Sequence, residues 1–159
     1  MAPLPVFNRA FGGSRTGDIL RYMDKIVVPY EPKIVVYYCG SNDINAGESA
    51  QPIFQRFRQF SQRLADESPA TRLFYVSINR APQKRDRWDV VDTANALVRK
   101  FCAEAKNREF IDVNPVLFDE NSKPRFELYM DDMLHLNDRG YEGFTAVIKP
   151  ILEKAWKEQ

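Results

Sequence analysis

The sequence is poor in the residues that build disulfide frameworks and metal centres. It contains one histidine and two cysteines among its 159 residues. Because Cys39 and Cys102 are too few and too far apart for a disulfide framework, we expect both to be reduced, buried thiols. One histidine with scattered carboxylates provides no cluster of transition-metal ligands. The sequence therefore predicts neither a metal centre nor a cofactor.

An excess of one charge and long apolar runs are also lacking. Lys plus Arg total 23 and Asp plus Glu total 22, so no field of one sign points to nucleic acid or to an anionic membrane. Residues 1–7 lack the basic start and apolar core of a signal peptide, and no apolar run can span a bilayer. We expect a cytoplasmic protein that binds a small, largely uncharged molecule. A natural start upstream of Met1 would weaken the cytoplasmic prediction, because a targeting segment would then lie outside the sequence.

Strand-like and helix-like apolar patterns alternate along the chain. Strands are predicted at residues 4–7, 33–39, 73–78 and 110–113, and helices at residues 19–27, 53–64, 91–105 and 141–152. The unbroken apolar run at residues 34–38 is typical of a strand buried on both faces of a parallel sheet. With 44% hydrophobic residues, the chain has enough apolar surface for one core. We predict one domain over residues 1–159, with the α/β fold of a three-layer α/β/α sandwich around a parallel sheet.

Two loops at predicted strand ends carry candidate functional groups, because ligands of parallel sheets bind outside the carboxyl ends of the strands. Residues 8–14 include Gly12 and Gly13, whose turn can offer backbone N–H groups to an anion. In residues 40–43, Asn42 follows a predicted buried strand and can direct its amide into the crevice. Each loop also has a plainer interpretation, a tight glycine turn in the first and an Asx turn in the second.

The only histidine, His135, closes a connection at residues 114–137 that is longer than usual and is therefore a candidate functional element. It follows Asp132 by three residues. In a turn, this spacing can bring the carboxylate to Nδ1 and leave Nε2 free as a general base. A lone histidine before a helix is also consistent with a surface or capping residue. The combination with the two other loops favours an active site.

These three segments together resemble the SGNH (GDSL-type) hydrolase family. Residues 8–20 are similar to its second block, residues 40–43 to its third, and residues 132–135 to its Asp-x-x-His block. The resemblance implies a flavodoxin-like fold and ester hydrolysis through an acyl-enzyme, with a small-molecule ester as substrate. It also implies roles for four residues: Gly13 and Asn42 as oxyanion-hole donors, and His135 and Asp132 as the base and its orienting carboxylate.

The chain departs from the family pattern at its start. The family's first block, a strand followed by Gly-Asp-Ser, carries the nucleophile and precedes the glycine block, but only residues 1–7 precede it here. We therefore expect an N-terminally truncated domain that lacks the first strand and has weak or no activity. A start at an internal methionine is favoured over a natural remnant, because every downstream element is intact. Ser14 and Ser41 are the candidate surrogate nucleophiles, although each is more simply a cap or turn residue.

Two further functions remain open from the sequence. One is a non-catalytic module that binds a small anion on the Gly12-Gly13 turn beside Arg15. The other is an interaction module, or a homo-oligomer, in which another chain completes the sheet. Because the resemblance places the missing strand between those at residues 4–7 and 33–39, we expect these two strands to close directly on each other, or another segment to fill the gap.

Overall fold

The computed structural model describes residues 5–158 and contains a parallel sheet of three strands. These are β1 (Ile34–Tyr37), β2 (Arg72–Val76) and β3 (Arg108–Ile111), in the order β1-β2-β3. Val35 pairs with Leu73, and Phe74 pairs with Glu109. Among the described residues, β1 and β3 are therefore the two edges of the sheet.

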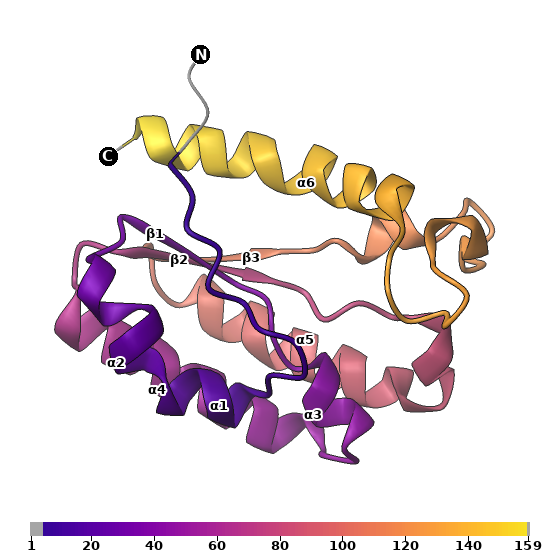
Figure 1. The fold of residues 1–159 in the computed structure, drawn as a ribbon, viewed down its shortest axis with the longest axis horizontal. Coiled ribbons are helices and arrows are strands. Elements are labelled where there is room, and N and C mark those ends of the chain that lie inside the picture. The colour runs from indigo at the N-terminus through magenta and orange to yellow at the C-terminus, as the bar shows by residue number, and fades with distance from the viewer. Residues whose placement is uncertain (1–4, 159) are drawn as a thin grey trace.

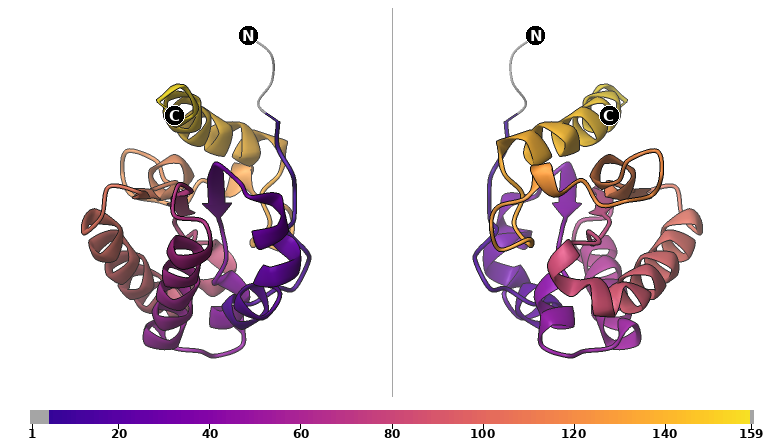
Figure 2. Two further views of the ribbon diagram at one scale, coloured as in Figure 1. Left: turned by 90° about the vertical axis from the view of Figure 1, so that its left-hand side faces the viewer. Right: turned by 90° about the vertical axis from the view of Figure 1, so that its right-hand side faces the viewer.

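Helices cover both faces of this sheet, as Figures 1 and 2 show. One face carries α6 (Asp138–Lys157), and the other carries α4 (Ala50–Glu67) and α5 (Trp88–Ala103), flanked by α1 (Thr16–Arg21) and α2 (Met23–Ile26). The connections contain α3 (Ser41–Asn45) and the short 3-10 helices η1 (Val28–Tyr30), η2 (Pro82–Arg87), η3 (Asn114–Leu117) and η4 (Phe126–Leu128). The predicted three-layer α/β/α architecture is confirmed. None of the helices within residues 5–158 combines the length and apolarity needed to cross a membrane.

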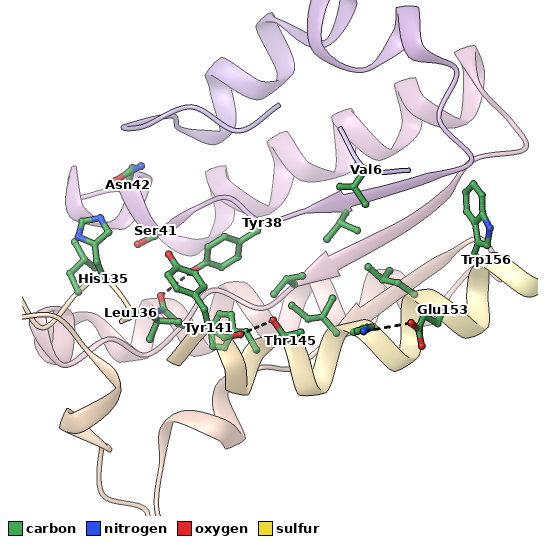
Figure 3. A pocket seen from close by; sticks show the side chains of 18 of the residues that line it. Val6, Tyr38, Ser41, Asn42, His135, Leu136, Tyr141, Thr145, Glu153 and Trp156 are labelled. Atoms are coloured by element: carbon green, nitrogen blue, oxygen red, sulfur yellow. Dashed lines mark hydrogen bonds and ion pairs between the residues drawn. The ribbon is translucent and has the colours of Figure 1, made fainter. Parts of the chain in front are cut away.

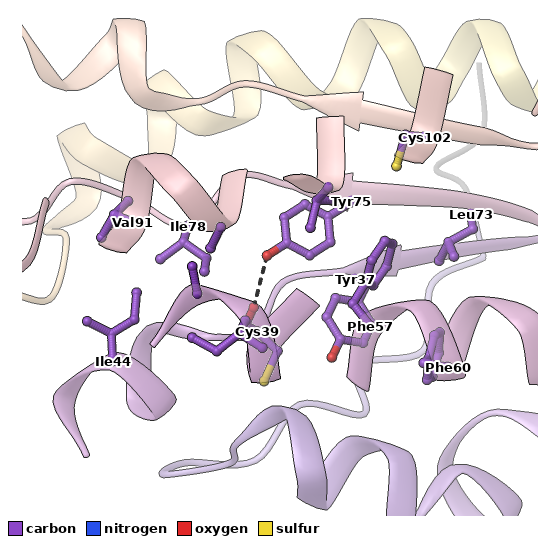
Figure 4. Packing of buried hydrophobic residues seen from close by; sticks show 14 of the residues in the cluster. Tyr37, Cys39, Ile44, Phe57, Phe60, Leu73, Tyr75, Ile78, Val91 and Cys102 are labelled. Carbon is purple, nitrogen blue, oxygen red and sulfur yellow. Dashed lines mark hydrogen bonds between the residues drawn. The ribbon is translucent and has the colours of Figure 1, made fainter. Parts of the chain in front are cut away.

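Alternation along β2 divides the core into two layers. Leu73 and Tyr75 face α4 and α5, where Tyr75 packs edge-on against Phe57 with ring centroids 4.7 Å apart (Figure 4). Phe74 and Val76 face the opposite side, in the cluster that α6 covers. All four side chains are buried. This strand is therefore apolar on both faces, which is typical of the interior strand of a parallel sheet.

The strand predicted at residues 4–7 is wrong for the part that the structure describes. Residues 5–7 form no strand, and Val6 and Phe7 are 79% and 70% exposed. Leu4 lies outside the described residues. Pro5 has no backbone N–H to donate to a ladder, which disfavours strand pairing at this point. The predicted direct closure of this segment on residues 33–39 is consequently not found.

The predicted burial of β1 on both faces is also wrong. Tyr37 is buried against α4, but Val36 is 44% exposed, and Tyr38, just after the strand, is 50% exposed. The physical reason is position, because α6 packs mainly over β2 and β3 and no strand pairs with the outer edge of β1 within residues 5–158. The face of β1 that points toward α6 therefore borders an open groove.

The two long helices α4 and α6 differ in how their first turns are capped. Asn137 caps α6, and its side-chain oxygen accepts a hydrogen bond from the Gly140 N–H at 3.2 Å. Ser49 occupies the N-cap position of α4, but its side chain makes no capping hydrogen bond. The connection at residues 114–137 is not structureless, since η3 and η4 lie within it. It leads directly into the turn that carries His135.

Candidate active site

A tight turn joins Asp132 to His135. The backbone N–H groups of Leu134 and His135 both donate to Asp132 Oδ1 at 2.9 Å, and Asp132 Oδ2 lies 2.5 Å from His135 Nδ1. Met133 adopts a left-handed conformation, with φ of 55°, that allows these contacts. Its carbonyl oxygen accepts from the Gln83 N–H at 3.0 Å, which ties the turn to η2. The carboxylate thus orients the imidazole, and Nε2 is left available.

The same contacts control the charge of Asp132. The hydrogen bond from His135, followed by those from the backbone N–H groups of His135 and Leu134, lowers the pKa of Asp132 to about 2. The carboxylate is therefore ionised at neutral pH. Both side chains are well exposed, His135 at 66% and Asp132 at 48%.

Asn42 connects the two other predicted loops. Its amide Nδ2 donates to the Ser14 carbonyl oxygen at 3.0 Å, directly after the turn in which Gly13 has a φ of 73°. An amide nitrogen carries two hydrogens, so one remains for a second acceptor. Gly40 makes this approach possible, because its φ of 129° suits glycine and a Cβ there would lie 2.5 Å from Ile78 Cδ1.

A buried carboxylate holds the starts of α1 and α3 together. Asp43 is fully buried, and its two oxygens accept from the Thr16 N–H at 3.1 and 3.0 Å and from the Thr16 hydroxyl at 2.5 Å. Arg56 on α4 donates to the same carboxylate at 3.1 Å and to Glu48 at 2.7 Å. This network was not predicted from the sequence, although one of its members, Asp43, directly follows the predicted site residue Asn42.

A groove runs between β1 and α6, with a volume of about 1010 Å³. Figure 3 shows Asn42, Ser41 and His135 at one end of it and Trp156 at the other. Apolar side chains line its length, including Val36, Val76, Ile148 and Leu152. The polar groups at the His135 end include Asn79, which is 3% exposed and accepts from the Tyr38 hydroxyl at 3.3 Å. The groove therefore offers an apolar floor with polar chemistry at one end.

The structure brings together some of the predicted site residues and not others. His135 and Asn42 line the groove. Asp132 does not line it but contacts His135 Nδ1. Gly13 and Ser14 are not among the lining residues. Ser41 does line the groove, so of the two serines considered as surrogates it is the one that a groove ligand can reach.

A buried lysine was not anticipated from the sequence. Lys84 in η2 is 2% exposed, and its Nζ donates to Ser41 Oγ at 2.8 Å. Burial lowers the pKa of Lys84 to about 8. The two residues are 43 positions apart, and no local pattern indicates that they meet.

Neither thiol is suited to nucleophilic chemistry. Burial raises the pKa of Cys39 to about 12 and that of Cys102 to about 11, so both remain protonated at neutral pH.

Within residues 5–158, no three His, Cys, Asp or Glu side chains are grouped so as to hold a metal ion.

Comparison of the sequence with protein families gives a match over most of the chain. The model of a family described as "GDSL-like Lipase/Acylhydrolase family" matches residues 1–142. Among curated proteins, none matches the sequence.

Several solved structures share the fold. A carbohydrate esterase family 3 protein from Talaromyces cellulolyticus is 19% identical, with a TM-score of 0.77 over 92% of this chain and 70% of its own. A GDSL-like lipase from Bacteroides thetaiotaomicron is 22% identical, with a TM-score of 0.71 over 90% and 73%. An acetylxylan esterase from Geobacillus stearothermophilus is 12% identical, with a TM-score of 0.72 over 86% and 66%. At these identities the likeness is one of fold.

Proposed function

Because the chain belongs to the GDSL-like lipase/acylhydrolase family, we propose that it is an ester hydrolase domain in which His135 is the general base and Asp132 orients it. The observation that carries the proposal is the 2.5 Å contact between Asp132 Oδ2 and His135 Nδ1, which leaves Nε2 at the polar end of the groove. A base of this kind must reach the proton of an attacking hydroxyl. The position of His135 beside Asn42 supports that function.

The proposed reaction proceeds through an acyl-enzyme. A serine hydroxyl attacks the ester carbonyl carbon and passes its proton to His135 Nε2, and the protonated imidazole then donates it to the leaving alcohol. Asn42 Nδ2 and the backbone N–H of Gly13 stabilise the oxyanion. The hydrogen bond from Asn42 to the Ser14 carbonyl supports this assignment, because it holds the two donor loops close together.

The attacking serine is the part that the 159 residues do not supply in the family's form, since they contain no Gly-Asp-Ser. The open edge of β1 suits an additional parallel strand, whose carboxyl end would reach the same end of the groove as Ser41 and Asn42. An N-terminal extension that carries such a strand followed by Gly-Asp-Ser would provide both the strand and the nucleophile. We therefore propose weak hydrolysis by the 159-residue form and full hydrolysis when the strand and its serine are present.

Binding of a small anion at the Gly12-Gly13 turn is the weaker alternative. The backbone N–H of Arg15, just after this turn, already donates to the Asp18 carboxylate at 2.9 Å and is not free for an anion. A second negative charge beside Asp18 is unfavourable. The local electrostatics therefore favour ester hydrolysis over anion capture at this turn.

The test compares two forms of the protein in p-nitrophenyl acetate hydrolysis. The 159-residue chain should show at most a weak rate, on the order of 10³ over water, which is the residual that survives loss of a triad member elsewhere. A chain extended at its N-terminus by a strand and Gly-Asp-Ser should be far faster, and His135→Ala should remove that gain. An extended chain that gains nothing, or a His135→Ala variant with an unchanged rate, would refute the proposal.

A further inference from the structure

Lys84 is a cation enclosed in the protein without a carboxylate partner. Its side chain is 2% exposed, and no Asp or Glu oxygen within residues 5–158 lies within ion-pair distance of Nζ. Lysines of this length usually extend their ammonium group to water. Among residues 5–158, the hydrogen-bond partner of Nζ is the Ser41 hydroxyl alone, at 2.8 Å. The protein thus directs a buried charge at a single hydroxyl on the wall of the groove.

The chemistry of the two groups fixes the direction of the hydrogen bond. An ammonium group has three donors and no acceptor, so Ser41 Oγ must accept. The hydroxyl hydrogen of Ser41 then points away from Lys84, and the described residues provide no acceptor for it. Since Ser41 lines the groove with Asn42 and His135 (Figure 3), this hydrogen is available to a ligand there. A hydroxyl that accepts from a cation is itself a stronger donor.

We propose that Ser41, whose oxygen accepts a hydrogen bond from the Lys84 ammonium group, donates its hydroxyl hydrogen to a ligand at the His135 end of the groove. The ligand atom is a carboxylate or oxyanion oxygen of the acyl group. Ser41 contacts the ligand, and Lys84 is a positioning residue that acts through it. The proposal rests on the proposed function in one respect, that the ligand is the acyl part of an ester or the acid released from it. At neutral pH the charge is present, because the pKa of Lys84 is about 8.

Two other functions of this pair are less consistent with the geometry. A purely structural role for Lys84 would leave the hydroxyl hydrogen of Ser41, which lines the groove, without an acceptor among the described residues. For Ser41 to act as a nucleophile, Lys84 would have to be neutral in order to take its proton, and below its pKa the ammonium group cannot do so. Donation to a bound oxygen requires no such change of charge.

The test measures acetate binding by NMR titration at neutral pH, so it does not depend on turnover. Ser41→Ala should weaken acetate binding about tenfold, as expected for loss of a charge-assisted hydrogen bond. Ser41→Thr keeps the hydroxyl and should restore it. Lys149→Met removes an exposed charge from the same groove and should change the affinity less than twofold. Absence of saturable acetate binding, or equal affinity in Ser41→Ala, would overturn the proposal.

A double variant separates positioning from a structural effect. Lys84→Met should weaken acetate binding in the wild type but not in the Ser41→Ala background, because Lys84 acts through the hydroxyl. A general loosening of the fold would weaken binding in both backgrounds and would overturn the proposal. So would covalent labelling of Ser41 by a fluorophosphonate, since that would make Ser41 a nucleophile. Acetate binding that persists in His135→Ala would distinguish this donor from the hydrolytic function.

Discussion

The Asn42 side chain donates to the Ser14 carbonyl oxygen at 3.0 Å, and this one bond joins the loop after β1 to the glycine loop before α1. The bond uses one amide hydrogen and leaves the other for the groove. Asn42 is therefore expected both to hold the glycine loop in place and to donate to a ligand. These two effects can be measured separately.

Asn42→Ala should increase amide hydrogen exchange at residues 11–14, because the glycine loop loses its tie to α3. In the N-terminally extended form it should also reduce kcat by about 10²- to 10³-fold, as expected for loss of one oxyanion donor. Asn45→Ala, at an exposed position of the same helix, is the matched control and should change neither quantity. An unchanged exchange rate in Asn42→Ala would show that the bond does not restrain the loop.

Asp43→Asn should lower the free energy of unfolding by about 3 to 5 kcal/mol, because Thr16 and Arg56 lose a buried ionised partner. Urea unfolding measures the change. Asp24→Asn provides the control, since Asp24 pairs with Arg63 at the surface with its side chain 64% exposed. That variant should lose less than about 1 kcal/mol. Similar losses in the two variants would contradict the buried network described here.

Gly40→Ala should be costly for two reasons, the φ of 129° and the 2.5 Å approach of a new Cβ to Ile78 Cδ1. We expect a loss of at least about 2 kcal/mol of unfolding free energy, measured by thermal or urea unfolding. Ile78→Val removes Cδ1 and should recover part of that loss in the double variant. Gly12→Ala meets open space and should be nearly neutral. A neutral Gly40→Ala would mean that this close contact does not exist in solution.

Lys84 should make stability rise with pH relative to a variant that lacks the charge. Burial lowers its pKa in the folded protein to about 8, from the ordinary value of 10.5. Between these values the unfolded chain binds a proton that the folded chain does not, so stability increases as pH rises through this window. The free-energy difference between the wild type and Lys84→Met should shift toward the wild type by up to about 1.4 kcal/mol per pH unit. A difference that stays constant from pH 7 to about 10 would show that the amine is not desolvated.

Sequence patterns predicted the parts of the fold that depend on local order. The apolar run at residues 73–78 predicted a strand where β2 lies, and the spacing of three between Asp132 and His135 predicted their contact. The same reasoning failed for Val36, because an apolar run shows what a strand can bury and not whether a neighbour is there to cover it. Position at the edge of a sheet is a property of the whole topology.

The missed parts of the site are contacts between distant segments. Lys84 meets Ser41 across 43 positions, and Thr16 meets Asp43 across 27. Each partner alone is an ordinary loop or helix residue, and only the packing of η2 and α1 against α3 brings the pairs together. A single sequence carries no periodic signal for such pairs.

The edge of β1 has a consequence for how this protein behaves at high concentration. Sheet edges in soluble proteins are usually blunted by proline, by lysine or by a bulge, but residues 34–38 contain only Ile, Val and Tyr. Val36 and Tyr38 are exposed beside this edge. Such a strand is a template for intermolecular pairing, so the 159-residue form should tend to aggregate through β1 as its concentration rises. A charge introduced at Val36 should improve its solubility.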